Sequence, residues 1–164
     1  MKIVIDPFDQ NSIDNAIKEL ERYKSWVQKK EETLRQRLSE IGESIASIEF
    51  NQAVYNGTNQ VSVRVEDDGR KATIFADGSA VLFIEFGSGA KYGGGHPDAG
   101  KFGYGPGTYS EGPNGKGHWD DPNGWYYEHG KRSFGNPPAM AMVHARDAML
   151  EQLTAIAREV FNSD

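Results

Sequence analysis

The segment from Ile84 to Tyr127 constrains the fold most, because it is rich in both glycine and aromatic residues. Thirteen of the nineteen glycines lie between Gly87 and Gly124. Glycine at this density weakens helices and strands alike, so we expect a long loop. Because flexible linkers contain few aromatic residues, the interleaved aromatics favour a functional loop over a plain linker. These aromatics are Tyr92, Phe102, Tyr104, Tyr109 and Trp119.

The rest of the composition is that of a globular protein. The 164 residues predict a single domain that spans 1–164, and 37% apolar and 26% charged residues are ordinary values. No stretch approaches the roughly 20 apolar residues of a membrane span, and the first eight residues do not form a secretory signal. The absence of cysteine excludes disulfides and thiolate metal sites. The net charge of −6 argues against retention on nucleic acid, which requires clustered Lys and Arg.

The first part of the chain, 1–55, predicts a short arm and a long helix. Lys2 to Ile5 is typical of a short edge strand that Pro7 ends, and Ser12 is the expected N-cap. Lys30 interrupts the apolar stripe of this helix, so we expect a bend or a break there. The stripe residues recur mostly at steps of three and four, which places them on one helix face: Ile13, Ile17, Leu20, Tyr23, Val27, Leu34, Leu38, Ile41, Ile45 and Ile48.

Two interpretations of this helix stay open. Its mixed acidic and basic residues favour a solvated face with ion pairs between residues four apart. Alternatively, it is a coiled-coil or subunit-packing helix, because a helix of this length is hard to cover within a small domain. In that case Trp26, which lies off the stripe, is a candidate contact with another subunit.

The next part, 56–86, predicts an antiparallel β-meander. Apolar and polar residues alternate from Val61 to Glu66, and the Asp68-Gly69 pair then predicts a hairpin turn. Ala72 to Ala76 is the expected return strand, and Asp77-Gly78 predicts a second hairpin. Ala80 to Phe86 is nearly continuous apolar sequence and is interpreted as the central strand, buried on both faces.

The last part completes an α+β fold. The loop is expected over 87–124, and a return strand over 125–135 that starts with Trp125, Tyr126 and Tyr127 and could pair as a fourth strand. In the final part, 136–164, Asn136 followed by two prolines predicts the start of a C-terminal helix that ends near Phe161. We therefore expect a meander of three to four strands, packed by a long N-terminal helix and a C-terminal helix.

None of the common catalytic motifs is complete. Gly87-Ser88-Gly89 lacks the first glycine of a nucleophile elbow, because Phe86 stands in that place. Gly103 and Gly105 are followed by Thr108 where a dinucleotide fingerprint requires glycine. A phosphate loop is also excluded, since Gly117 follows Lys116 where Ser or Thr is needed. We therefore predict no enzyme activity and no cofactor.

Several polar residues still have more than one interpretation. A metal could be held in the loop by His118, Asp120, Asp121 and Glu128, although bracing of the loop is the simpler role. Glu85 is unusual because it lies inside an apolar run, where a carboxylate needs partners. It could accept backbone N–H groups and so anchor the following loop, contact another subunit, or act in catalysis. The aromatics Trp119, Trp125, Tyr126 and Tyr127 could form a small core under the loop or anchor an interface.

The region from Ala80 to Met142 resembles a known protein family. Ala80 to Gly89 reads Ala-Val-Leu-Phe-Ile-Glu-Phe-Gly-Ser-Gly and is similar to the (I/V)EFGTG motif of the bacteriophage tail-component family. These are neck proteins, which act in head–tail joining or tail completion in long-tailed phages and prophages. Further similar blocks follow in the same order over the region up to Met142: His96-Pro97, Gly107-Thr108-Tyr109, Gly124 to Tyr127, and Gly135 to Ala139.

The resemblance implies a structural role in the virion, with assembly in the host cytoplasm. Proteins of this kind form rings, for example hexamers, between the capsid portal and the tail tube, and contact neighbouring neck and tail proteins. DNA would only pass through the lumen, and no membrane partner is implied. The segment from Ile48 to Tyr55 lacks the Ala-Pro-x-x-Thr-Gly-x-Leu sequence of many members, so joining, completion and terminator positions all stay open.

The expected interface residues combine the motif and the loop. The residues are Trp26, Glu85, Phe86, Tyr92, His96, Tyr104, Tyr109, Trp119, Trp125, Tyr126 and Tyr127. Two alternatives belong to other functional classes. One is a metal-dependent hydrolase that uses His96, His118 and nearby carboxylates, and the other is a peptide- or glycan-binding module that uses the aromatic loop.

Overall fold

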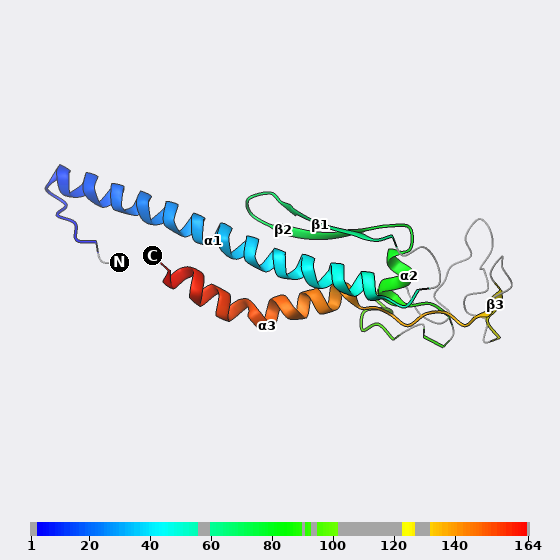
Figure 1. Cartoon of the computed structure of the whole chain (residues 1–164). Helices are drawn as coiled ribbons and strands as arrows, with labels where there is room; N and C mark the ends of the chain where they lie inside the picture. Colours follow the sequence, from blue (N-terminus) through cyan, green and yellow to red (C-terminus); the bar gives the residue numbers. More distant parts are fainter. Residues whose placement is uncertain are drawn as a thin grey trace.

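The computed structural model describes residues 3–55, 60–89, 91–92, 95–101, 123–126 and 132–163, with Trp125 and Tyr126 described by their backbone alone. The predicted mixture of a long N-terminal helix, a C-terminal helix and an antiparallel sheet is confirmed (Figure 1). The elements are α1 (Gln10–Gln52), β1 (Ser62–Asp67), β2 (Ala72–Asp77), α2 (Val81–Phe86), β3 (Trp125–Tyr126), β4 (Arg132–Ser133) and α3 (Ala141–Asn162).

Helix α1 runs without interruption for 43 residues. The predicted N-cap is wrong: Asp9 caps the helix by accepting the Asn11 N–H, whereas Ser12 Oγ accepts the Asp6 N–H. The predicted break at Lys30 is also wrong. The Lys30 Nζ donates to the Ser163 carbonyl oxygen at 2.6 Å, at the end of α3, where a cation stabilises the unpaired carbonyls and the negative end of the helix dipole.

Helix α3 lies antiparallel along α1, and its last turn reaches only the level of Trp26 and Lys30 (Figure 1). The Trp26 ring meets the Phe161 ring edge-on, with centroids 5.9 Å apart. Arg37 donates to Glu159 at 3.0 Å, and this hydrogen bond and positive charge lower the pKa of the Glu159 carboxyl. The first turns of α1 therefore extend beyond α3, and we call residues 10–25 the overhang.

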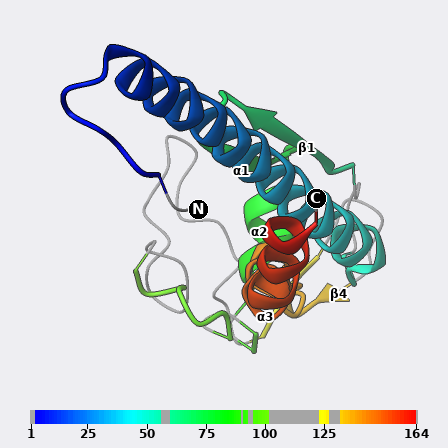
Figure 2. The ribbon, with the colours of Figure 1, turned by 90° about the vertical axis from the view of Figure 1, so that its left-hand side faces the viewer.

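Strands β1 and β2 form the predicted hairpin, in a register that runs from Ser62 opposite Asp77 to Asp67 opposite Ala72. The turn forms as its sequence predicts, because Gly69 takes a positive φ of 86° and Asp68 Oδ1 accepts the N–H groups of Arg70 and Lys71. In the end-on view, α1 lies between this hairpin and α3 (Figure 2).

The expected central strand is instead the short helix α2, so the predicted three-stranded meander is wrong. The Asp77-Gly78 pair leads into this helix and not into a second hairpin. A short apolar run fits a buried helix as well as a buried strand, because its hydrophobicity has no period to distinguish them. Ile84, Glu85 and Phe86 are all buried, as the sequence indicates, but on a helical turn.

The predicted fourth strand and edge strand also differ. β3 pairs with β4, Trp125 opposite Ser133, and within the described residues neither joins the β1–β2 sheet. Residues 3–5 form no strand. Of the expected loop, 90, 93–94 and 102–122 lie outside the described residues, and the described parts contain only an isolated bridge between Ser88 and Asn136.

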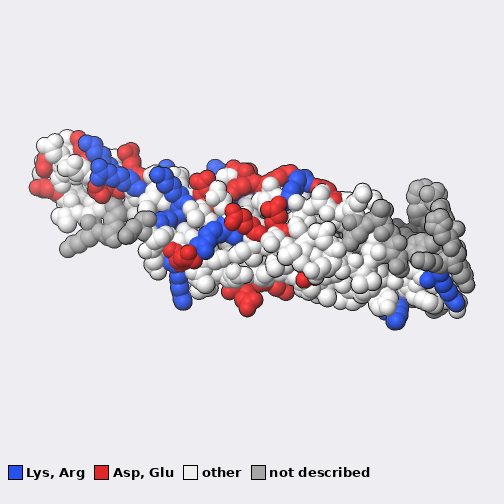
Figure 3. All heavy atoms as spheres, viewed as in Figure 1, with Lys and Arg blue, Asp and Glu red and all other residues white. Residues whose placement is uncertain are grey.

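The hydrophobic core lies at the carboxyl-terminal end of α1. Phe50 and Ile84 are its fully buried large side chains, and Ala46, Ala141 and Ala145 let α1, α2 and α3 approach closely there. The described helices include none with the length and apolar character to cross a membrane. On the face shown in Figure 3, Lys and Arg are interspersed with Asp and Glu and form no large basic patch.

Candidate functional site

The end of α2 is joined to the segment that precedes α3. The Ala139 N–H donates to the Ile84 carbonyl oxygen at 2.8 Å, and the Met140 N–H to that of Glu85 at 3.2 Å. The Asn136 side-chain amide donates to the Phe83 carbonyl oxygen at 2.9 Å. Asn136 therefore pairs with a free carbonyl group at the end of α2. It is not the cap of the last helix, which begins at Ala141, five residues later than predicted.

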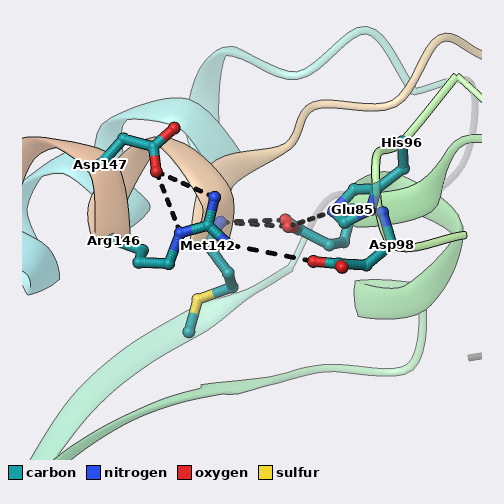
Figure 4. Close-up of polar contacts among 6 residues, drawn as sticks. All are labelled: Glu85, His96, Asp98, Met142, Arg146 and Asp147. Atoms are coloured by element: carbon teal, nitrogen blue, oxygen red, sulfur yellow. Dashed lines mark hydrogen bonds and ion pairs between the residues drawn. The ribbon is translucent and has the colours of Figure 1, made fainter. Parts of the chain in front are cut away.

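Glu85 acts as the cap of α3 from a distant point in the sequence. Met140, at the N-cap position, has a left-handed backbone with φ 55° and makes no side-chain capping bond. Both carboxylate oxygens of Glu85 instead accept the Met142 N–H, at 3.2 and 3.1 Å (Figure 4). A carboxylate at a helix N-terminus is stabilised by the free N–H groups and by the helix dipole.

His96 supplies the second donor to Glu85, and its own hydrogen bonds assign its tautomer. The Asp98 N–H donates to His96 Nδ1 at 3.0 Å, so Nδ1 is an acceptor without a proton. The proton of the neutral ring therefore lies on Nε2, which donates to Glu85 Oε1 at 3.1 Å. We call this unit, made of Glu85, His96 and the Met142 N–H, the Glu85 clasp.

The clasp is enclosed within the chain. Glu85 and His96 are each only 4% exposed, and the Phe86 ring covers the imidazole with centroids 4.2 Å apart. Both ring nitrogens of His96 are used in internal bonds, so the imidazole has no free position for proton transfer to a substrate. The arrangement instead ties the segment after α2 to the first turn of α3.

A cavity of about 550 Å³ adjoins the clasp. Its walls are mainly apolar and come from β2, α2 and the first turns of α3, and the clasp residues Glu85, His96 and Met142 also line it. Arg146 lies at its edge, with Nη2 2.9 Å from Asp147 Oδ1 and Nη1 3.9 Å from Asp98 Oδ2 (Figure 4). The described residues contain no group of three His, Asp or Glu side chains that could hold a metal.

The structure brings together only part of the predicted interface set. Glu85, Phe86 and His96 meet in the clasp, whereas Trp26 packs on Phe161 near the end of α3. Tyr92 is half-buried, with Lys91 Nζ 5.0 Å from its ring centroid. Trp125 and Tyr126 have a described backbone only. The following residues lie outside the described part: Tyr104, Tyr109, Trp119, Tyr127, and the metal candidates His118, Asp120, Asp121 and Glu128.

Sequence reasoning missed the partners that complete this site. A backbone N–H carries no residue-specific signal, so the contributions of Met142 and Asp98 were not predictable. The one available signal was the absence of a capping residue directly before α3, in the sequence Pro137-Pro138-Ala139-Met140. Together with an acid in an apolar run, it could have suggested that Glu85 caps the last helix.

Comparisons with protein-family models, with curated proteins and with solved structures found no significant match to this chain.

Proposed function

We propose that this protein is a virion structural subunit of a tailed phage or prophage. In this proposal it acts in the neck, as a ring-forming tail-completion or head–tail joining protein. The proposal rests on the resemblance of Ala80 to Met142 to the phage tail-component family. It is supported by what the motif residues do in this fold.

The observation that carries the proposal is the Glu85 clasp. Glu85, Phe86 and His96 are motif residues, and all three are buried in contacts that join separate elements of the chain. A motif whose polar groups are used internally favours an architectural role over a catalytic one. The hydrolase alternative requires a free His96, and both of its ring nitrogens are occupied.

The overhang supports assembly with further copies. Ile17 and Leu20 are 50% and 53% exposed, although they continue the apolar stripe that packs on α3 farther along α1. Exposed apolar residues in a row are typical of surfaces that become covered in an assembly. A ring needs such surfaces, because each subunit contacts the next through two different faces.

The charge of the chain agrees with transient passage of DNA. With 18 basic and 24 acidic residues, the chain lacks the excess of positive charge that holds DNA by release of counterions. A ring of such subunits would let DNA move through its lumen without retaining it. The neighbouring partners would be other neck and tail proteins.

Light scattering over a concentration series, combined with electron microscopy of negatively stained particles, tests this proposal. We expect a closed oligomer with a central opening. A protein that stays monomeric at every concentration, or forms a compact particle without an opening, would contradict the ring assignment.

A further inference from the structure

The outer edge of β2 pairs with no other described strand. The Asp68 N–H donates to the Lys71 carbonyl oxygen, which sets the alternation of hydrogen-bonded pairs along the hairpin. By this alternation, the N–H and C=O groups of Ala72, Ile74 and Ala76 point away from β1. In the described part of the chain β2 pairs with β1 alone, so these groups are available to a further strand.

Two apolar cavities run along this open edge. The cavity beside the clasp takes Ile74, Phe75 and Ala76 from β2, and a second cavity of about 530 Å³ is lined by consecutive residues from Lys71 to Ile74. Helix α3 lines both cavities on the opposite side, together with α2 in the first and α1 in the second, and no β1 residue lines either cavity. The cavities therefore form one groove between the β2 edge and α3, in which the side chains of an added strand could lie.

The N-terminal arm, residues 3–8, has the sequence of a strand but pairs with no strand among the described residues. Ile3, Val4 and Ile5 are β-branched residues, which favour extended conformations, and Pro7 would end the strand. Val4 is 78% exposed and Ile5 53% exposed, and Phe8 is almost fully exposed. The arm lies over largely polar residues of the first turns of α1, which leaves most of its apolar surface in water.

The arm cannot reach the groove of its own chain. The start of β2 lies at the level of Arg35 to Ser39 of α1, since these residues line the same cavity. Gln10 and Arg35 are separated by about 37 Å at 1.5 Å per helical residue. Asp6 is four residues from Gln10 and can extend at most about 14 Å from it.

We propose that residues 3–5 of one copy add as an antiparallel third strand to the β2 edge of a neighbouring copy. In the register that fits, Ile3 lies opposite Ile74, and Ile5 lies opposite Ala72. These are hydrogen-bonded pairs, because residues 72 and 74 carry the outward groups. Ile74 faces α1, where it approaches Gly42, so Ile3 and Ile5 face the same way and enter the groove.

Charge selects the antiparallel orientation. In this orientation Asp6 of the arm lies beside Lys71, the exposed cation that precedes β2. A parallel arm would bring Asp6 to Asp77, where two acids would repel each other. The exchange rests on the proposed function in that it requires a second copy, and it names the contact that would link neighbouring subunits.

Disulfide crosslinking tests the register, because the chain has no native cysteine. Val4 would face Thr73 in a non-hydrogen-bonded pair, in which the Cα atoms are about 4.5 Å apart, within the range that a disulfide spans. Val4→Cys and Thr73→Cys are placed on separate full-length chains that differ in tag size, mixed, oxidised and separated without reductant. We expect several-fold more mixed dimer than in a mixture of Val4→Cys with Ser62→Cys, an exposed β1 position in the same sheet.

Equal yields in the two mixtures would overturn the proposal, provided that circular dichroism shows each variant to be folded. If Thr73→Cys does not fold, Asp6→Cys with Lys71→Cys replaces this pair, because these residues lie opposite each other in the same register and also form a non-hydrogen-bonded pair. As an independent measurement, the double variant Ile3→Asp/Ile5→Asp should reduce the oligomer mass and keep the helical content. An unchanged mass would also overturn the proposal.

The failure of the arm exchange and that of the ring can be distinguished. A closed ring without the crosslink rejects the exchange and keeps the proposed function. The crosslink in open chains keeps the exchange and rejects the closed ring. A monomer without crosslink rejects both.

Discussion

Among single residues, Glu85 has the most consequential position. It stabilises the start of a helix that lies 57 residues away from it in sequence, since its carboxylate accepts the Met142 N–H. This agrees in part with the prediction that Glu85 accepts backbone N–H groups. The N–H belongs to α3, however, and the link to the loop passes through the His96 ring.

We predict that Glu85→Gln destabilises the fold. Glutamine has one acceptor oxygen and an NH₂ group, so one of the two donors that face Glu85 would meet another donor. Loss of a buried hydrogen bond to a charged group costs about 1.5–3 kcal/mol. The measurement is the free energy of unfolding in urea, with Glu151→Gln, an exposed residue of α3, as the matched control.

The result would contradict the role of the clasp if Glu85→Gln and Glu151→Gln changed the free energy of unfolding equally. Amide hydrogen exchange of residues 141–144 gives a second readout. The first turn of α3 should exchange faster in Glu85→Gln than in the control, because the Met142 N–H is held by a weaker acceptor once the carboxylate is lost.

Among the elements, those with a local signal were predictable and those made by distant contacts were not. The steps of three and four between the apolar residues of α1, and the Asp68-Gly69 turn between β1 and β2, are patterns of residues that lie close together in sequence. Helix α2 has no such signal. The carbonyl groups at its end accept hydrogen bonds from Asn136, Ala139 and Met140. A short apolar run contains no pattern that predicts partners about 50 residues later in the sequence.

The hairpin turn should contribute to the acid sensitivity of the protein. The N–H groups of Arg70 and Lys71 lower the pKa of Asp68 below the 3.8 of a free side chain. A lowered pKa in the folded state means that the ionised form adds stability above the unfolded pKa. This contribution is lost as the pH falls through the lower, folded value.

Asp68→Asn should therefore be less stable than the native protein at pH 7, and the difference should shrink as the pH falls from about 4 toward 2. The measurement is the unfolding midpoint in urea across this pH range. The exposed α3 variant Glu151→Gln serves as the control. A difference that stayed constant with pH would show that the Asp68 charge has no part in the stability of the turn.

Gly42 marks the point where α1, β2 and α3 meet. An added Cβ would overlap Ile74 Cδ1 and lie only 2.8 Å from Met149 Sδ. Alanine is the better helix former by about 1 kcal/mol, but here this gain is opposed by overpacking. The glycine therefore keeps the hairpin and α3 close to α1, and through them the groove along β2.

We predict that Gly42→Ala and Ile74→Val are coupled. Ile74→Val removes the Cδ1 atom that the new Cβ would meet, so the double variant should be more stable than the sum of the single changes, by about 0.5–3 kcal/mol. The free energies of unfolding of the four proteins measure this coupling. Ser44→Ala, at an exposed position of α1, should show no coupling with Ile74→Val.

The molecule is an elongated pair of helices with its core at one end and, at the other, an overhang on which the apolar side chains of Ile17 and Leu20 are exposed (Figure 1). The core end holds the clasp and the groove, and the overhang carries the arm. An arm that cannot reach its own groove and an apolar stripe that continues past its own partner helix have the same consequence. Both leave apolar surface that no other described residue of the chain covers, and such surface is typical of contacts with another molecule.

We therefore predict that Leu20→Gln weakens assembly without weakening the subunit. Leu20 is half-exposed on the overhang and is not part of the hydrophobic core of the subunit. Its substitution should therefore change the free energy of unfolding by less than about 0.5 kcal/mol. The oligomer mass at a given concentration, measured by light scattering, should fall because an apolar contact between copies is lost. Arg22→Gln, also exposed on the overhang but off its apolar stripe, should leave the mass unchanged. A Leu20→Gln protein with native mass would place the subunit contact elsewhere and leave the overhang without a role in assembly.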